Sequence, residues 1–158
     1  MGRTIEAIAW RENALHLIDQ TKLPMNEHYL VIQDVASLID AIKRLVVRGA
    51  PALGVAGAYG VALALAEGAR NGWSESKLQS EIDFIRDARP TAVNLAWGVN
   101  QVRDLVHAGF DAVLQVAHRI AMDDKNSCES MSNNGADWLI KRFGNKKLKL
   151  LTHCNTGS

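Results

Sequence analysis

The sequence predicts an α+β fold in which an antiparallel β meander is followed by a helical bundle and then by the start of a parallel α/β sheet. Three observations support this prediction. Apolar positions alternate with a period of two over residues 4–33, a helical spacing replaces this alternation from Val35 onward, and a final helical segment leads into the apolar residues 148–151. A helix that leads into an apolar strand is typical of the start of a parallel α/β sheet.

The meander is expected to contain three short strands. Apolar residues alternate with more polar ones over residues 5–9 and again over residues 14–21, and YLVIQ at residues 29–33 forms the third run. Residues 11–13 supply the first turn. Connections this short favour antiparallel pairing.

Two helices surround the stretch on which the functional prediction depends. The first is expected to run to Arg48 with one apolar face, which consists of Val35, Leu38, Ile39, Ile42, Leu45 and Val46. The pattern breaks at Gly49-Ala50 and restarts at Pro51, a residue that fits the first turn of a helix. This second helix is expected to end near Asn71-Gly72.

Helical patterns continue through most of the remaining chain. Ser74 is the predicted N-cap of a helix that ends around Arg89, because Pro90 disfavours the α conformation just before it. Further helices are expected over residues 91–108 and over about residues 110–143.

We expect two domains. Residues 1–120 are predicted to form the α+β domain, and residues 121–158 a linking helix and the start of a second, truncated domain. In open α/β folds, ligands bind at the carboxyl ends of the strands, which is where residues 152–157 are expected. Because this second sheet has one predicted strand and no successor, we expect the chain to be a fragment of a longer protein.

Composition places the chain among soluble globular proteins. Its 158 residues are 47% apolar and 22% charged, with a net charge of +1, which argues against nucleic acid or an acidic membrane as a partner. The N-terminus lacks the apolar core of a signal peptide, and the longest apolar stretch, residues 55–66, is too short and weakly hydrophobic to span a bilayer. Cys128 and Cys154 form no CxxC pattern, so we expect a reduced, cytoplasmic protein.

The first candidate site is the stretch VRGAPALGVAGAYG at residues 47–60. The first N–H groups of a helix are unsatisfied and lie at the positive end of its dipole, so they attract an anion. Arg48 precedes this helix start with a planar, permanently charged group that suits phosphate. The small residues that follow also fit a second interpretation, a tight helix–helix corner. The residues alone leave both interpretations open.

Arg89-Pro90-Thr91 repeats this arrangement. An arginine again precedes a proline at an expected helix start, with a hydroxyl group in the first turn. Two such corners can hold one phosphate from two sides. The alternative for Arg89 is a solvated charge at a helix end, which is the commoner role of an arginine.

Cys154 is the candidate nucleophile or polar sulfur. It follows the predicted strand, lies between His153 and Asn155, and is close to a glycine, so backbone N–H groups are able to face it and favour its thiolate. The alternative is a buried structural cysteine. The five histidines show no metal-ligand spacing, and Asp123-Asp124 fits a solvated helix end better than an acid/base pair.

Three segments occur along the chain in a fixed order: VRGAPA at residues 47–52, RPTAVNL at residues 89–95 and LTHCNTG at residues 151–157. Taken together they closely resemble the signature segments of the methylthioribose-1-phosphate isomerase family. AIAWRENALHLIDQTKLP at residues 7–24 also resembles the opening β-hairpin of that family. The family shares a superfamily with the regulatory subunits of translation initiation factor 2B.

The resemblance implies an N-terminal α+β domain followed by a Rossmann-like domain, and it implies a reaction. The aldose 5-methylthioribose 1-phosphate becomes the ketose 5-methylthioribulose 1-phosphate. Because the phosphate blocks the anomeric oxygen, the ring must open with acid assistance before hydrogen moves from C2 to C1. By similarity, Arg48, Gly49, Ala50 and Arg89 hold the phosphate and Cys154 stabilises the transition state. No metal or organic cofactor is expected, and the full-length enzyme usually forms a homodimer.

The chain departs from this family in its length. Family members are considerably longer, and their general-acid aspartate, a substrate-binding glutamine and an Asn-Lys pair lie in the part that has no counterpart here. The resemblance therefore implies half an active site, and we expect the chain alone not to isomerise substrate. The alternatives are a ribose 1,5-bisphosphate isomerase, a non-enzymatic regulatory subunit of the initiation factor 2B type, and an inactive truncated gene product.

Overall fold

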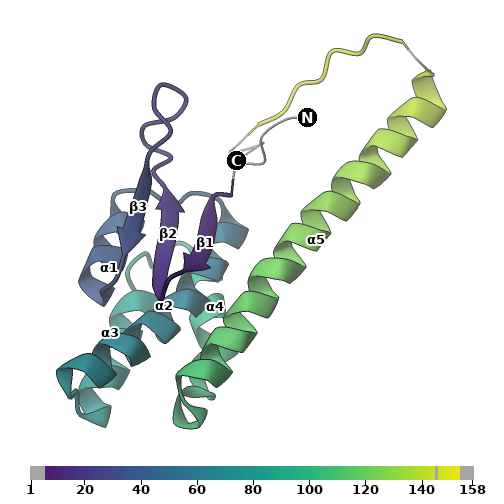
Figure 1. The fold of residues 1–158 in the computed structure, drawn as a ribbon. Coiled ribbons are helices and arrows are strands. Elements are labelled where there is room, and N and C mark those ends of the chain that lie inside the picture. The colour runs from purple at the N-terminus through teal and green to yellow at the C-terminus, as the bar shows by residue number, and fades with distance from the viewer. Residues whose placement is uncertain (1–5, 145, 154–158) are drawn as a thin grey trace.

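Three short strands form one antiparallel sheet in the computed structural model, which describes residues 6–144 and 146–153. Glu12 and Asn13 join the first two strands with φ angles of 51° and 58°. Two consecutive residues in the left-handed region make the hairpin turn whose twist matches that of the strands. The strands are β1 (Ile8–Arg11), β2 (Ala14–Ile18) and β3 (Tyr29–Ile32), in the spatial order β1-β2-β3 (Figure 1). The predicted meander is confirmed.

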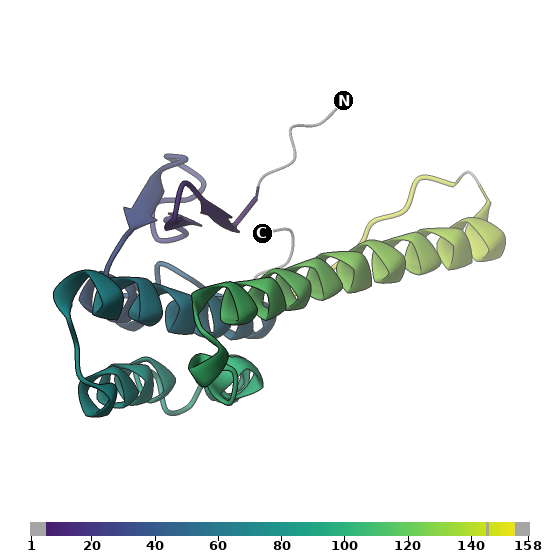
Figure 2. The ribbon, with the colours of Figure 1, turned by 60° about the horizontal axis from the view of Figure 1, so that its bottom comes forward.

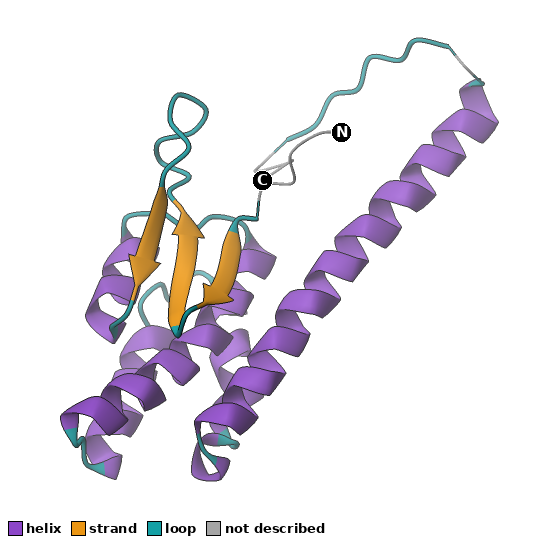
Figure 3. Cartoon of the chain, viewed as in Figure 1, coloured by secondary structure: helices purple, strands orange, loops and turns teal. Residues whose placement is uncertain are grey.

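Helices make up most of the remaining described chain. They are α1 (Val35–Lys43), α2 (Ala50–Asn71), α3 (Glu75–Arg86), α4 (Val93–Arg103), the 3-10 turn η1 (Val106–Ala108) and α5 (Phe110–Phe143) (Figure 3). Figure 2 shows three layers, with the sheet on one side, α2 in the middle, and α3 and α4 on the other side.

The strand register places one apolar row of the sheet against the helices. Leu15 lies opposite Trp10 on one neighbouring strand and Ile32 on the other, so the three side chains share a face. Leu15 and Leu17 are fully buried. The inward row consists of Ile8, Trp10, Leu15, Leu17, Leu30 and Ile32, all of which belong to or pack against the core.

Helix α1 is fixed at its start and ends earlier than the sequence predicts. The Oδ1 of Asp34 accepts a hydrogen bond from the Ser37 N–H at 2.7 Å and caps the helix. Glu67, near the end of α2, accepts from the Val35 N–H at 2.8 Å. The helix was expected to run to Arg48 but ends at Lys43, because Leu45 has a φ of 62°, which an α-helix cannot accommodate.

Helix α2 is the element around which the others pack. It begins at Ala50, one residue before Pro51, and ends at Asn71, and Gly72 follows as a C-cap in the left-handed conformation, as predicted. It contacts β1, β2 and all four other α-helices. At 22 residues, with a mean hydropathy of 1.4 in its most apolar window, α2 is by length and composition long and apolar enough to cross a membrane. The apolar stretch at residues 55–66, on which the sequence prediction rests, is too short to do so. However, 67% of that window is buried, as in the core helix of a soluble protein.

The crossing of α2 and α4 brings their backbones into contact. A Cβ atom on Gly98 would lie 1.9 Å from the Gly54 carbonyl oxygen, and a Cβ atom on Gly57 would lie 2.6 Å from the Leu95 carbonyl oxygen. Only glycine permits this approach. The interpretation of the small-residue stretch as a tight helix–helix contact is therefore confirmed.

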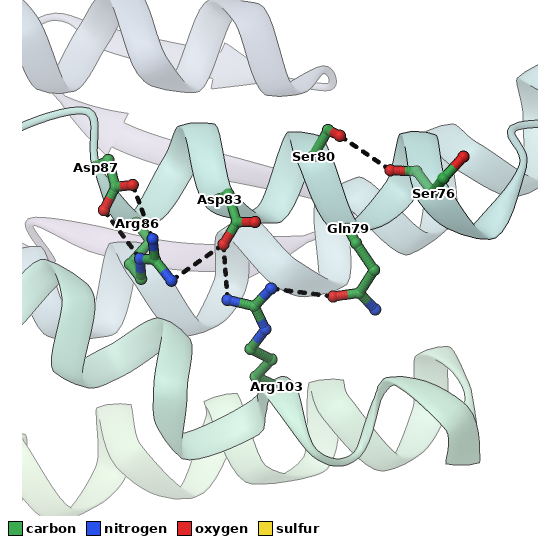
Figure 4. Close-up of polar contacts among 7 residues, drawn as sticks. All are labelled: Ser76, Gln79, Ser80, Asp83, Arg86, Asp87 and Arg103. Carbon is green, nitrogen blue, oxygen red and sulfur yellow. Dashed lines mark hydrogen bonds and ion pairs between the residues drawn. The ribbon is translucent and has the colours of Figure 1, made fainter.

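Polar side chains join α3 to α4 on the outer side of this crossing (Figure 4). Arg103 donates to the Oδ1 of Asp83 at 2.7 Å and to the Oε1 of Gln79 at 3.2 Å. Arg86 pairs with Asp83 at 3.1 Å and donates two hydrogen bonds to Asp87, each at 2.8 Å. The hydrogen bond from Arg103 is the main reason why the pKa of Asp83 is lowered. The second helix layer thus has its own polar connections.

Helix α5 is anchored to the sheet and α2 at its start. Val113 and Ala117 are fully buried, and His118 Nδ1 lies 2.9 Å from the Tyr59 hydroxyl group. Trp10 stacks on Tyr59 with ring centroids 5.7 Å apart. Burial, and to a lesser extent the charge of Glu6, raises the pKa of Tyr59 to about 12. An aromatic cluster therefore fixes the first turns of α5.

The far part of α5 leaves the body of the protein (Figure 1). Met122, Met131 and Trp138 are 56%, 69% and 61% exposed. The predicted boundary at residue 120 stays a prediction, and α5 passes through it without a break. The α+β fold class is confirmed.

The strand predicted over residues 148–151 is not formed. Residues 146–153 have no regular secondary structure, and Leu150 and Leu151 are 74% and 100% exposed. A strand is held by hydrogen bonds to a neighbouring strand, and the sheet of the described chain consists of β1, β2 and β3 alone. The apolar pattern is present without a pairing partner.

We predict that Gly98→Ala lowers the free energy of unfolding by about 3 kcal/mol or more, because its Cβ atom forces the α2 and α4 backbones apart. Gly135→Ala is the matched control, since a Cβ atom there meets nothing within 4 Å on exposed α5. The control is expected to be neutral or to stabilise by about 0.5–1 kcal/mol through helix propensity. Urea unfolding of both variants measures the difference, and equal stabilities contradict the close crossing.

Candidate functional site

An irregular segment, residues 44–49, delivers the chain to the start of α2. The Val46 N–H donates to the Ala41 carbonyl at 2.9 Å, and Val46 and Val47 are buried. Gly49 is the N-cap of α2 and has a φ of 92°, in the region that favours glycine. The buried valines therefore fix the middle of this segment.

The start of α2 has no side-chain cap. Gly49 lacks a side chain and Pro51 lacks an N–H group, so the N–H groups of Gly49, Ala50 and Ala52 are left at the positive end of the helix. The first backbone hydrogen bond of the helix runs from the Leu53 N–H to the Gly49 carbonyl at 3.1 Å. In the part of the chain that the structure describes, these N–H groups have no hydrogen-bond partner, and the anion site stays a prediction.

Arg48 lies beside these donors with its charge uncompensated. Its side chain is half-buried, and Nε donates to the Leu45 carbonyl at 3.2 Å. Within residues 6–144 and 146–153, no carboxylate forms an ion pair with Arg48 or with Arg89. A guanidinium group in this state is available to an anionic ligand.

Arg89 precedes a turn rather than a helix start. The Ala92 N–H donates to the Arg89 carbonyl at 2.9 Å, which places Pro90 at the second position of a β-turn. Helix α4 begins only at Val93, so the prediction that Pro90 opens the helix is wrong. The fixed φ of proline serves the turn equally well, and the turn still brings the half-buried Arg89 to the approach of α4.

The two helix starts border one groove. Pro51 on α2 and Asn94 on α4 both line a groove of about 710 Å³, together with residues of the first half of α5. Neither Arg48 nor Arg89 is among the lining residues. The structure therefore brings together the two helix starts that the sequence singled out, while the two arginines lie at their approaches.

The remaining candidates lie at the end of the chain or on exposed α5. Cys154 lies outside the described residues, while Thr152 and His153 before it are exposed. Cys128 is an exposed free cysteine. Asp123 and Asp124 line the groove, and partial burial raises the pKa of Asp124. In the described ranges, no group of three His, Cys, Asp or Glu side chains is placed to hold a metal ion.

Comparison with known proteins identifies the family. A model of the initiation factor 2 subunit family matches residues 46–158. The chain belongs to this family.

The curated relatives of this chain include a single-function isomerase and a bifunctional enzyme. Methylthioribose-1-phosphate isomerase from Pseudomonas fluorescens is 39% identical over 161 residues, covering 98% of this chain and 45% of the relative. A probable bifunctional methylthioribose-1-phosphate isomerase/methylthioribulose-1-phosphate dehydratase from Nocardia farcinica is 40% identical over 152 residues, covering 96% of this chain and 28% of the relative. The chain thus spans less than half the length of these relatives.

Two solved structures are also similar to this chain, and one of them is a subunit of a translation initiation factor. The delta subunit of translation initiation factor eIF-2B from A. fulgidus matches with a TM-score of 0.67 and 38% identity, over 77% of this chain and 38% of that one. 5-Methylthioribose 1-phosphate isomerase from Pyrococcus horikoshii matches with a TM-score of 0.63 and 27% identity, over 74% of this chain and 36% of that one.

Sequence reasoning missed the residues that support the site from the sheet side. Asp19 is buried, and its Oδ1 accepts hydrogen bonds from the Thr21 N–H at 3.0 Å and the Thr21 hydroxyl at 2.5 Å. The hydrogen bond from the Thr21 side chain is the main cause of the lowered pKa of Asp19, against a smaller effect of burial. An Asx turn of the type Asp-x-Thr directly after a strand is the signal that was available.

We predict that Asp19→Asn lowers thermal stability at pH 7, by about 1 kcal/mol, and that the difference from the wild type disappears in acid. A lowered pKa gives stability that is fully present above the unfolded value, near 3.8, and lost as the pH falls through the folded value. The two melting curves should therefore converge in acid, as the pH falls below 3.8 and through the lowered folded pKa of Asp19.

Thermal melting from pH 7 to pH 2 measures this convergence. Asp137→Asn, on the exposed part of α5, controls for the loss of one negative charge. A difference between Asp19→Asn and the wild type that is constant over the whole pH range contradicts the prediction.

Proposed function

We propose that this chain is the phosphate-binding part of a methylthioribose-1-phosphate isomerase, which converts 5-methylthioribose 1-phosphate into 5-methylthioribulose 1-phosphate. The observation that carries the proposal is the start of α2, which has no side-chain cap, beside Arg48, which forms no ion pair with another described residue. Curated relatives with this name that match 98% of the chain support the same reaction.

The proposed roles follow from the donors at the site. The N–H groups of Gly49 and Ala50 and the guanidinium group of Arg48 bind the phosphate, and Arg89 approaches it from the turn before α4. Holding the phosphate fixes the sugar for ring opening and for proton movement from C2 to C1. Cys154 stabilises the transition state. The general acid belongs to the part of the longer relatives that this chain does not span.

We extend the proposal to the setting of the complete enzyme. It acts on a small phosphorylated sugar in the cytoplasm, as a homodimer, and without a metal or organic cofactor. Nucleic acid and membranes are not partners in this proposal, in keeping with the net charge of +1.

A regulatory subunit of the initiation factor 2B type is the second candidate function. The likeness to the A. fulgidus delta subunit, with a TM-score of 0.67, favours it. A purely regulatory subunit has no need of a phosphate-binding arginine, so binding at Arg48 separates the two functions. An isomerase of ribose 1,5-bisphosphate shares the first phosphate site, and a comparison of the two sugar phosphates as substrates of the full-length protein distinguishes it.

We predict that Arg48→Ala weakens phosphate binding by about tenfold, the effect of one charge-assisted hydrogen bond. The measurement is an NMR titration of the ¹⁵N-labelled chain with inorganic phosphate, followed at the Gly49 and Ala50 amides. Arg44→Ala is the matched control, because Arg44 is four residues away and its charge pairs with Asp40 at 2.6 Å. Equal affinities of the two variants argue against the anion site.

We also predict that the purified chain does not isomerise 5-methylthioribose 1-phosphate by itself. Ring opening needs an acid within hydrogen-bond reach of the substrate, and the proposal places that acid outside this chain. ³¹P NMR of substrate incubated with the chain measures turnover. Turnover that rises in proportion to the amount of chain contradicts the prediction.

A further inference from the structure

Gln20 connects the end of the sheet to the segment that carries the candidate anion site. It lies two residues after β2 and is buried, with 8% of its surface exposed. Its backbone N–H donates to the Val46 carbonyl at 3.1 Å, and its side-chain Nε2 donates to the Arg48 carbonyl at 3.5 Å. Gln20 therefore bonds to the carbonyl groups of two residues, Val46 and Arg48, in the segment that leads into α2.

The bond to the Arg48 carbonyl determines where the next N–H group points. A trans peptide is planar, and its C=O and N–H bonds point in opposite directions. When Gln20 holds the Arg48 carbonyl oxygen, the N–H of Gly49 must point away from Gln20. This N–H is the first of the unpaired donors at the start of α2.

Residues 44–49 need such a contact because little else fixes this peptide. Leu45 and Gly49 both have positive φ angles, 62° and 92°, and Gly49 has no Cβ atom to restrict rotation of the peptide. The hydrogen bond from Arg48 Nε to the Leu45 carbonyl orders the side chain of Arg48 but not its carbonyl. Gln20 is the described side chain that bonds to that carbonyl.

Gln20 is itself held in place from both sides. The Asx turn between Asp19 and Thr21 surrounds it, and the Asp19 N–H donates to the His28 carbonyl at 2.7 Å. The turn fixes the backbone of Gln20, so the position from which its side chain reaches the Arg48 carbonyl is fixed as well. The side-chain amide of Gln20 thus connects the end of the sheet to the residues just before α2.

We infer that Gln20 is a positioning residue for phosphate: it orients the Arg48–Gly49 peptide so that the Gly49 N–H joins the donors at the start of α2. The inference rests on the proposed phosphate site. Gln20 does not touch the ligand, and its effect passes entirely through the peptide that it holds.

The test is a phosphate titration of the full 158-residue chain carrying Gln20→Met, which keeps the side-chain length and removes the donor. The probe is inorganic phosphate, followed by NMR at the Gly49 amide. Affinity is expected to fall about threefold to tenfold, the effect of one neutral hydrogen bond. The Gly49 amide resonance is expected to shift even without phosphate, because the peptide rotates.

Two comparisons separate positioning from a general loss of stability. Tyr59→Phe removes a hydrogen bond on the part of α2 that faces α5, so it lowers the melting temperature and should leave phosphate affinity unchanged. Gln20→Asn keeps the amide and the backbone bond but shortens the reach, and it should lose affinity as Gln20→Met does. It also provides the same test if the methionine variant does not fold.

The outcomes distinguish this inference from the function on which it rests. If phosphate does not bind to the wild type, or if Arg48→Ala binds it unchanged, both the proposed site and the role of Gln20 are wrong. If Arg48→Ala weakens binding while the folded Gln20 variants bind like the wild type, the positioning role alone is overturned.

Discussion

Backbone contact between α2 and α4 is the constraint on which the rest of the fold depends. Because the Gly54 and Gly98 backbones meet without intervening side chains, the two helices approach more closely than larger residues permit. This approach brings Pro51 and Asn94, near the first turns of both helices, to the border of one groove. The same small residues leave α2 thin enough to be covered by the sheet and by the other α-helices.

Local signals were sufficient to predict most of the elements. The antiparallel meander, the Ser74 cap and the glycine at position 72 each follow from signals within a few residues, and the structure confirms all three. Three predictions failed, among them the extension of α1 to Arg48, because the residues either fit more than one local structure or need a distant partner. Residues 148–151 have the composition of a strand but need a neighbouring strand, and Pro90 fits a turn as well as a helix start.

The candidate site was partly accessible from the sequence for the same reason. Arg48, Gly49 and Ala50 are adjacent in the chain, so their arrangement at a helix start follows from proline and glycine chemistry. Gln20 was not accessible, because it reaches the site through a contact between residues that are 28 positions apart. Tyr59 and His118 were missed likewise, since 59 positions separate the two partners. Where Cys154 lies relative to Arg48 is a further long-range question, and Cys154 falls outside the described residues.

Because α5 is long, a small change in the packing of its first turns moves its far end by a large distance. Its 34 residues span about 50 Å, yet its fully buried residues, Val113 and Ala117, lie in its first turns. A tilt of a few degrees about this base displaces the far end, near Phe143, by several ångströms. The aromatic cluster of Trp10, Tyr59 and His118 at this base therefore sets the direction in which the exposed part of α5 extends.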